Sequence, residues 1–345
     1  AVNETDLIIE VSYKRDGISP GDKRKIEQSL KENINENYNQ DKKILVKTVS
    51  SDSSDVLGTR KTETVPVKPA QVKTGHATPA AKKKVENVKN IIAVSSCKGG
   101  VGKSTLAVNL ALSLLAEGNK VGVIDADIYG PSIPILLGAR GKKPDSNGED
   151  KMLPIEAYGL KFLSFGSFIP EEDPVIWRGP MLGGILNQFL FDADWGELDY
   201  LIIDLPPGTG DMQLSMIQAT DIQGTVIVST PQTVALHDTK KGIAMFQKVN
   251  VPILGMVENM SYFVPEDAPE KTYYIFGKQG VQKACSTMGI DFLGEIPLLT
   301  EIRSGGDEGR PFMSITANQG NKTWQAFTSI AKSIDKKLNP KESKS

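Results

Sequence analysis

The chain has 345 residues, a formal net charge of −2 at pH 7 and 39% hydrophobic residues, a composition typical of soluble globular proteins. This length predicts two domains, or one large domain with an extension. The nearly balanced charge predicts no general attraction to nucleic acid or to anionic membranes. No apolar run reaches the ~18 residues that a transmembrane helix needs, and no signal-peptide pattern opens the chain, so a cytoplasmic protein is expected.

The first part of the chain predicts a partial α+β accessory domain over residues 1–50. A β-like run at 7–11, a helical pattern at 21–33 and a second apolar run at 44–49 form a small βαβ unit. Residues 51–89 are polar and rich in Pro, Thr and Lys, which predicts a flexible basic linker. A basic segment that docks on a partner is the alternative interpretation of the same residues.

From residue 90 to 338, apolar strands alternate with helical patterns, and a short tail follows at 339–345. Most of the predicted strands are unbroken apolar runs, as expected for strands covered on both faces; they are 90–96, 121–126, 160–165, 199–204, 224–230, 252–257 and 291–294. One helix is predicted at 104–117. The alternation predicts an α/β fold with a doubly wound, mostly parallel sheet, whose ligands lie at the carboxyl ends of the strands.

A glycine-rich loop, Cys-Lys-Gly-Gly-Val-Gly-Lys-Ser at 97–104, joins the first of these strands to the helix. Glycines let backbone N–H groups converge on phosphate oxygens, and the helix N-terminus adds positive potential. Lys103 is predicted to neutralise the β- and γ-phosphates, and Ser104 to ligate Mg²⁺. A dinucleotide-binding turn fits less well, because Thr105 stands where a small residue is needed. The other predicted nucleotide-binding residues of this loop are Gly99, Gly100, Val101, Gly102 and Thr105.

Acidic residues end two of the predicted strands. Carboxylates beside a triphosphate repel it unless Mg²⁺ or water uses them, so these acids predict catalytic or metal roles rather than turns or caps. Asp127 is expected to orient or activate the attacking water. Asp125 is expected to support the Mg²⁺ shell, and Asp204 to hold an Mg²⁺-bound water. Gly208, in the Pro-Pro-Gly turn that follows, can bring its N–H to the γ-phosphate and distinguish ATP from ADP.

Taken together, these motifs resemble the Mrp/ApbC branch of the MinD/ParA-like ATPases, P-loop NTPases of the SIMIBI type with a deviant Walker A loop. The matching stretches are 96–104, 125–132, 177–181, 204–211, 230–232 and 257–263. The resemblance implies that Lys98 is the signature lysine that reaches the partner subunit's phosphates in a homodimer, joining Lys103 and Asp127 in the catalytic set. It also implies that Asn259 reads the adenine, since its amide offers both a donor and an acceptor.

The same resemblance implies a [4Fe–4S] cluster as cargo and client apo-proteins as partners. Family members commonly carry C-P-x-C shortly after the Asn-Met-Ser-Tyr-Phe stretch, but residues 263–277 of this chain contain no cysteine. Glu266 and Asp267 are hard donors and poor substitutes for thiolates. Cys285 stands alone and is expected to be a buried apolar residue. The residues thus offer no convincing iron–sulfur ligands, and poor retention of a cluster is predicted.

Two classes of function remain open from the sequence. The first is a homodimeric iron–sulfur cluster carrier or assembly factor that binds ATP and hydrolyses it slowly. The second is an ATP-dependent switch or scaffold without a metal, which docks on a partner, a membrane or the nucleoid. A C-terminal helical pattern could lie on a membrane, but packing against the sheet is expected; its apolar residues are Trp324, Phe327, Ile330, Ala331, Ile334 and Leu338.

Overall fold

The computed structural model describes residues 9–14, 29, 44–49, 83–147, 151–168 and 179–340. It divides into two compact units, Ala1–Gly75 and His76–Ser345. In the first unit, β1 (Ile9–Lys14) pairs in parallel with β2 (Ile44–Val49). Parallel neighbours need a crossover between them, in agreement with the predicted βαβ unit. The predicted helix at 21–33 lies outside the described residues except for helical Ser29, and the predicted domain bounds stay a prediction.

The second unit is built on an eight-stranded sheet with the order β12-β11-β10-β3-β9-β4-β8-β7. All seven predicted strands are present and run parallel to one another, which confirms the predicted sheet. They are β3 (Val88–Ser95), β4 (Val121–Asp125), β8 (Leu160–Ser164), β9 (Leu198–Asp204), β10 (Gly224–Ser229), β11 (Ile253–Asn259) and β12 (Phe292–Ile296).

The sequence did not predict the short strands at one edge. β7 (Ile155–Ala157) pairs antiparallel with β8, and β5 (Asp145–Ser146) forms a separate antiparallel ribbon with β6 (Met152–Leu153). Strands of two or three residues are too short for an alternating pattern to be recognised. They form because neighbouring segments supply hydrogen-bond partners.

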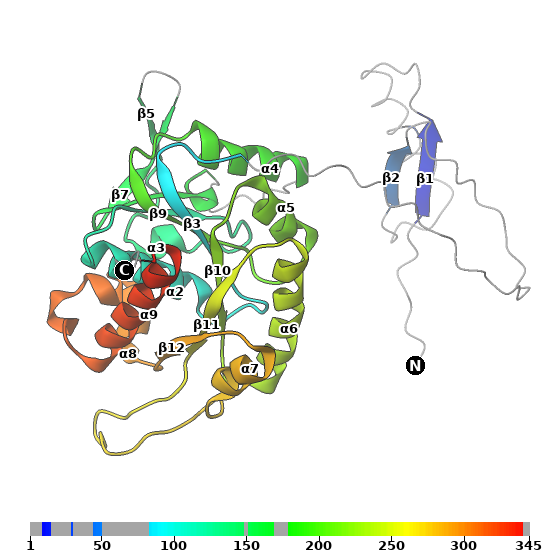
Figure 1. Ribbon diagram of the computed structural model, residues 1–345. Coiled ribbons are helices and arrows are strands. Elements are labelled where there is room, and N and C mark those ends of the chain that lie inside the picture. The colour runs from blue at the N-terminus through cyan, green and yellow to red at the C-terminus, as the bar shows by residue number, and fades with distance from the viewer. Residues whose placement is uncertain are drawn as a thin grey trace, which may run out of the picture. The chain divides into compact units, whose positions relative to one another are not determined.

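Helices cover both faces of the sheet (Figure 1). Their bounds are α2 (Lys103–Ala116), α3 (Ile133–Leu136), α4 (Gly179–Asn187), α5 (Asp211–Ala219), α6 (Thr233–Lys248), α7 (Gly280–Met288), α8 (Thr300–Asp307) and α9 (Lys322–Leu338), with a π-helical turn at Gln188–Asp192 and 3-10 turns at Phe165–Ser167, Phe312–Ser314 and Thr316–Asn318. Ile92 and Val94 of β3 pack into the core beneath α2 and α9. Ile91 and Ala93 pack into the opposite core, beneath α5 and α6. This alternation explains why the strand is apolar throughout.

The C-terminal helix packs on the sheet, as expected. Phe327, Ile330, Ala331 and Ile334 of α9 are buried in the same core as α2, so this apolar face is not available to a membrane surface. Among the described residues, no helix combines the length and the apolar character that crossing a bilayer requires.

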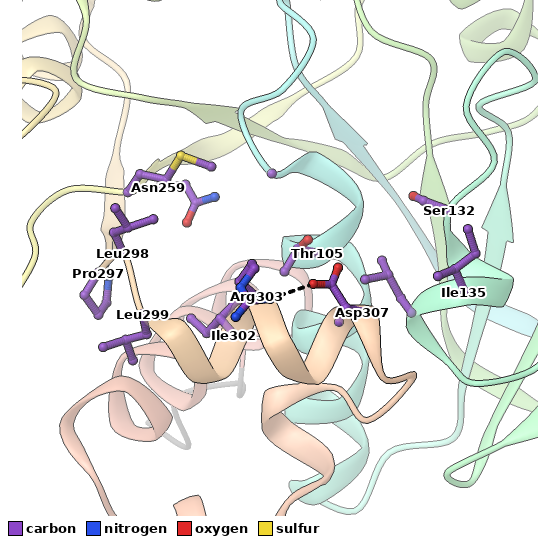
Figure 2. Close-up of a pocket in the computed structure, with 14 residues that line it drawn as sticks. Thr105, Ser132, Ile135, Asn259, Pro297, Leu298, Leu299, Ile302, Arg303 and Asp307 are labelled. Atoms are coloured by element: carbon purple, nitrogen blue, oxygen red, sulfur yellow. Dashed lines mark hydrogen bonds and ion pairs between the residues drawn. The ribbon is translucent and has the colours of Figure 1, made fainter.

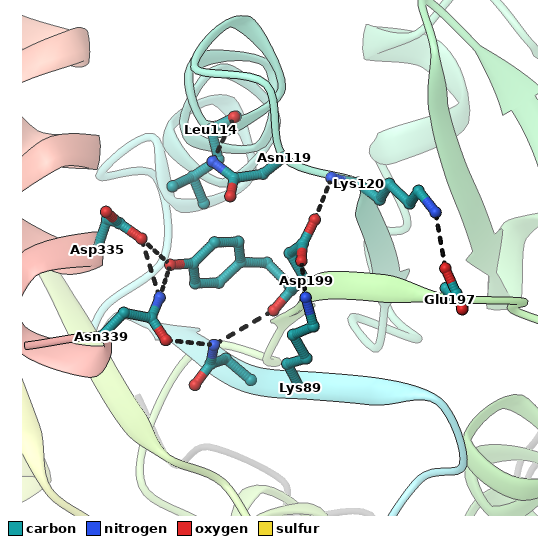
Figure 3. A network of polar contacts seen from close by, with 10 residues as sticks. Lys89, Leu114, Asn119, Lys120, Glu197, Asp199, Asp335 and Asn339 are labelled. Atoms are coloured by element: carbon teal, nitrogen blue, oxygen red, sulfur yellow. Dashed lines mark hydrogen bonds and ion pairs between the residues drawn. The ribbon is translucent and has the colours of Figure 1, made fainter. Parts of the chain in front are cut away.

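A polar network fastens the last turn of α9 to the sheet (Figure 3). The Tyr200 hydroxyl of β9 donates to Asp335 and accepts a 2.6 Å hydrogen bond from Asn339 Nδ2. Asn90 Nδ2 of β3 bonds to Asn339 Oδ1 at 3.4 Å and to the Asp199 carbonyl at 3.3 Å. Burial raises the pKa of Tyr200 above its ordinary value, so the phenol remains a donor. The network covers the amino ends of β3 and β9, at the opposite end of these strands from the glycine-rich loop.

We predict that Tyr200→Phe lowers the free energy of unfolding by about 1 kcal/mol, because the ring stays packed while the hydrogen bonds of its hydroxyl are lost. Urea denaturation measures the change. Tyr129→Phe is the matched control, since the Tyr129 side chain is 77% exposed and its hydroxyl is hydrated in both states. Equal stability of the Tyr200 variant and the intact chain would contradict the prediction.

Candidate functional site

The glycine-rich loop leads from the carboxyl end of β3 into α2, which begins at Lys103. Gly102 precedes the helix in a left-handed conformation with φ +83°. A Cβ at this position would lie 2.2 Å from Nδ2 of Asn259, so only glycine fits the turn and its neighbour. The helix has no side-chain cap at this end, which leaves first-turn N–H groups to bind an anion.

Charged groups from three strand ends meet at the start of α2. Lys103 Nζ lies 2.8 Å from Asp204 Oδ1 and 3.5 Å from Asp127 Oδ2. The Ser104 hydroxyl donates to Asp204 Oδ2 at 2.5 Å. Burial raises the pKa of Asp204, while the Lys103 ammonium acts in the opposite direction. The fold therefore brings together the loop residues and acids that the sequence analysis singled out, although their catalytic roles stay predictions.

Asp125 is fully buried, and three hydrogen bonds from neighbouring residues fix its carboxylate. Its carboxylate accepts hydrogen bonds from the Ile133 N–H at 3.1 Å, the Ser164 hydroxyl at 2.9 Å and the Asp127 N–H at 3.2 Å. Burial, together with the nearby Asp204 carboxylate, raises the pKa of Asp125 to about 7. These contacts fix the loop that carries Asp127. Sequence reasoning missed Ser164, because nothing in its own strand pattern distinguishes it.

The donor set at this site fits Mg²⁺ shared with phosphate. Ser104 and Asp204 present adjacent hard oxygens, and Mg²⁺ in nucleotide sites takes one or two such protein ligands and completes its shell with phosphate and water. The described residues contain no group of three or more His, Cys, Asp or Glu side chains that could hold a metal alone. A shared ion is therefore more compatible with this site than a fully protein-bound one.

A pocket of about 350 Å³ opens beside the loop (Figure 2). Asn259, at the end of β11, lines it and donates through Nδ2 to the Val101 carbonyl at 2.8 Å. An apolar wall with an amide at its edge suits a planar heterocycle. Sequence reasoning did not identify the other wall residues, which come from α3 and the residue before it, the turn after β11, the loop after β12, and α8: Ser132, Ile135, Leu136, Met260, Pro297, Leu298, Leu299, Ile302, Arg303, Gly306 and Asp307.

The second glycine turn is tied to the phosphate loop. The Gly208 N–H donates to the Ser96 carbonyl at 2.9 Å, and the Ser96 hydroxyl donates to the Lys98 carbonyl at 3.0 Å. A contact between Gly208 and a γ-phosphate would require the first of these bonds to be exchanged. The Lys98 side chain is exposed, as a residue that reaches a second subunit must be. Trp177 and Arg178, of the matching stretch 177–181, lie outside the described residues.

Cys285 is buried and Cys97 is half-buried. Cys97 packs against α6, where a Cβ on Gly242 would lie 2.1 Å from Cys97 Sγ. Burial raises the pKa of Cys97 to about 11. Cys285 is 2% exposed, which confirms the expected buried position, and burial likewise raises its pKa to about 11. A thiol must lose its proton to bind a metal, and the burial of these two side chains opposes that loss.

Comparison with known proteins identifies the family. A family model described as ParA, NUBPL iron-transfer P-loop NTPase, matches residues 87–335. The chain belongs to this NUBPL family. An iron–sulfur cluster carrier protein of Aquifex aeolicus is 48% identical over 262 residues, which are 75% of this chain and 71% of that protein. The expected resemblance to the iron–sulfur branch of these ATPases is confirmed.

Two solved structures support the fold of the NUBPL-family domain. A nucleotide-binding protein of Archaeoglobus fulgidus, solved in complex with ADP, is 36% identical with a TM-score of 0.59, over 69% of this chain and 91% of that one. The septum site-determining protein MinD of Pyrococcus horikoshii, solved with Mg-ADP, has a TM-score of 0.55 at 23% identity, over 73% and 98%. The predicted α/β architecture is therefore that of MinD-type P-loop NTPases.

The contact between α6 and the phosphate loop of this NUBPL-family chain yields a prediction. Gly242→Ala should lower the free energy of unfolding by about 1–3 kcal/mol through overpacking against Cys97, and urea denaturation measures it. Alanine in place of glycine otherwise stabilises a helix by roughly 0.5–1 kcal/mol. Gly184→Ala in α4 is the matched control, because its Cβ would meet nothing within 4 Å.

A second substitution tests the cause of that loss. Cys97→Ala removes the sulfur, and the remaining Cβ lies 3.7 Å from the new methyl group, an ordinary contact. The double variant should therefore recover most of the stability that Gly242→Ala alone loses. Simple additivity of the two changes would show that the clash is not with Cys97.

Proposed function

We propose that this chain binds Mg-ATP, hydrolyses it slowly and acts as a homodimeric carrier or assembly factor for iron–sulfur clusters. The observation that carries the nucleotide half is the convergence of Lys103, Ser104, Asp127 and Asp204 at the start of α2. The carrier half is supported by relatives of nearly half identity that are named iron–sulfur cluster carrier proteins. Client apo-proteins are the partners that this function requires.

Each residue at the site has a defined task in this proposal. Lys103 exchanges its ion pair with Asp204 for the β- and γ-phosphates, and Asp204 with Ser104 then holds Mg²⁺. The bound ion supplies neutralisation of phosphate charge. Asp127 is held in place because its N–H donates to the Asp125 carboxylate. Its own carboxylate orients the attacking water and accepts its proton. Asn259 faces the base in the adjoining pocket, where its carbonyl oxygen accepts from the exocyclic amine of adenine.

Two substitutions separate nucleotide binding from hydrolysis. Lys103→Ala should abolish measurable ATP binding in calorimetry, because it removes the cation that neutralises the phosphates. Asp127→Ala should bind ATP within a few-fold of the intact chain and lose turnover by about 10²-fold or more in phosphate release. Lys248→Ala, at the far end of α6, is the surface control. Unchanged ATP affinity in the Lys103 variant would refute the phosphate-loop assignment.

The exposed position of Lys98 supports a role between subunits. We predict that ATP, but not ADP, doubles the mass measured by light scattering, because Lys98 contacts the γ-phosphate held by the second copy. Lys98→Ala should remain monomeric with ATP. The hydrolysis-deficient Asp127→Ala variant should keep the dimer longer than the intact chain. The same mass in every nucleotide state would contradict dimer formation through this lysine.

Cluster carriage has to work without a cysteine pair. A dimer contains only four thiols, and two of them, the Cys97 pair, are packed against α6. We predict that anaerobic reconstitution with iron and sulfide gives a substoichiometric cluster that a chelator removes within minutes, with or without ATP. Client proteins would then supply further ligands. Chelator-resistant, stoichiometric iron that disappears in Cys285→Ser would contradict this and identify Cys285 as a ligand.

One observation favours the second function, an ATP-dependent switch without a metal. In the cysteine-free segment 263–277 the chain exposes apolar side chains, with Tyr273 49% and Ile275 57% exposed. Such a surface suits a protein partner better than a metal cluster. The reconstitution experiment separates the two functions, since a switch gains no iron and still responds to ATP.

A further inference from the structure

Glu258 is a fully buried carboxylate that the nucleotide chemistry described above does not use. It lies next to the last residue of β11 and accepts two short hydrogen bonds. The Ser261 hydroxyl donates to Oε1 at 2.7 Å, and the Val281 N–H donates to Oε2 at 2.7 Å. A buried carboxylate is costly unless its oxygens are bonded. The two hydrogen bonds of Glu258 therefore offset the cost of burying its carboxylate, and each of them holds a neighbouring segment in place.

The first bond supports a strained turn. Met260 has φ +54°, a left-handed conformation that costs a non-glycine residue of order 1 kcal/mol or more. Such a turn persists only when surrounding contacts hold it. Ser261 provides them, because its N–H donates to the Ile296 carbonyl at 3.0 Å and its hydroxyl lies between Glu258 and Glu295, 2.6 Å from Glu295 Oε2. The turn is thus fixed to both β11 and β12.

The second hydrogen bond caps the N-terminus of α7. Val281 is in the first turn of this helix, whose N-cap residue Gln279 makes no side-chain hydrogen bond to it. The carboxylate of Glu258 takes the place of that cap, and a negative charge there is favoured by the helix dipole. Residues 262–280 lie between the two groups that Glu258 binds. Glu258 thus holds the two ends of that segment close together.

Asn259 is held between these supports. Successive side chains of a strand point to opposite faces, so Glu258 faces α7 while Asn259 faces the pocket beside α2. The Asn259 amide reaches Val101 of the phosphate loop. Its direction is set by the backbone on either side, which is the Glu258 anchor before it and the Met260 turn after it.

We propose that Glu258 is a positioning residue for base recognition, which acts by fixing the turn that aims the Asn259 amide at the base. This inference rests on the proposed ATP function and deepens it. Without the two hydrogen bonds of Glu258, the turn at Met260 relaxes from its left-handed conformation, and the Asn259 amide no longer points at the edge of the base. Contacts to the phosphates come from other segments, the glycine-rich loop and α2, and are retained.

The chemistry of the anchor provides a matched pair of variants. In Glu258→Gln, the amide oxygen can accept from the Val281 N–H while the amide nitrogen donates to the Ser261 oxygen. The Ser261 hydroxyl then donates its hydrogen bond to Glu295. The turn and the helix start keep their bonds. In Glu258→Ala, the Val281 N–H and the Ser261 hydroxyl both lose a partner. Shape and hydrogen bonding, rather than charge, should therefore decide the outcome.

The test is the ratio of the Kd values for GTP and ATP, measured by calorimetry. Glu258→Ala should reduce this ratio about tenfold, and Glu258→Gln should restore it to within about threefold of the intact chain. In an Asn259→Ala background, Glu258→Ala should change the ratio no further, because the anchor acts through the amide. A merely structural role would lower stability without this dependence on Asn259.

Other results overturn the inference. A folded Glu258→Ala variant with the ratio of the intact chain, or a fall that adds to that of Asn259→Ala, would show that Glu258 does not act through the amide. If Glu258→Ala does not fold, Ser261→Ala removes one bond of the anchor, and an unchanged ratio in that variant contradicts the proposal. A ratio near one in the intact chain would instead refute the adenine role of Asn259 itself.

Discussion

The ion pair between Lys103 and Asp204 is the interaction around which the site is arranged. Both side chains are buried, at 6% and 0% exposure, and a buried charge that loses its partner destabilises a protein by several kcal/mol. The pair joins the first residue of α2 to the end of β9, and Ser104 bonds to the same carboxylate. The phosphate loop is therefore preformed. A triphosphate would replace one strong partner of Lys103 with another.

The parallel sheet makes this arrangement possible. Because β3, β9, β4 and β11 are parallel, their carboxyl ends lie along one edge, and the loop, the acids and Asn259 share that edge. The amino ends of β3 and β9 are closed instead by the Tyr200 network with α9. The contacts at the amino ends of the strands thus stabilise the fold. The carboxyl ends carry buried charges and a strained turn, as functional sites commonly do.

The two halves of the proposed function have unequal support within the molecule. Hard oxygen ligands and a cation are gathered at the phosphate loop, whereas the chain's only two thiols are a half-buried and a buried cysteine. Burial raises the pKa of both cysteines, and the segment at 263–277 offers carboxylates and exposed aromatic residues in place of thiolates. A carrier built in this way would release its cluster easily, since no strong ligand set retains it.

The sequence by itself determined the seven parallel strands, the phosphate loop and the strand-end acids, because these depend on local periodicity and on short motifs whose backbone geometry is nearly fixed. It also indicated that α9 would pack inward and that Cys285 would be buried. The tertiary structure alone decided which distant side chains touch: Ser164 with Asp125, Gly242 with Cys97, α8 with the pocket, and Glu258 with α7. Such contacts leave no periodic signal, since each depends on the relative placement of two elements that are specified independently.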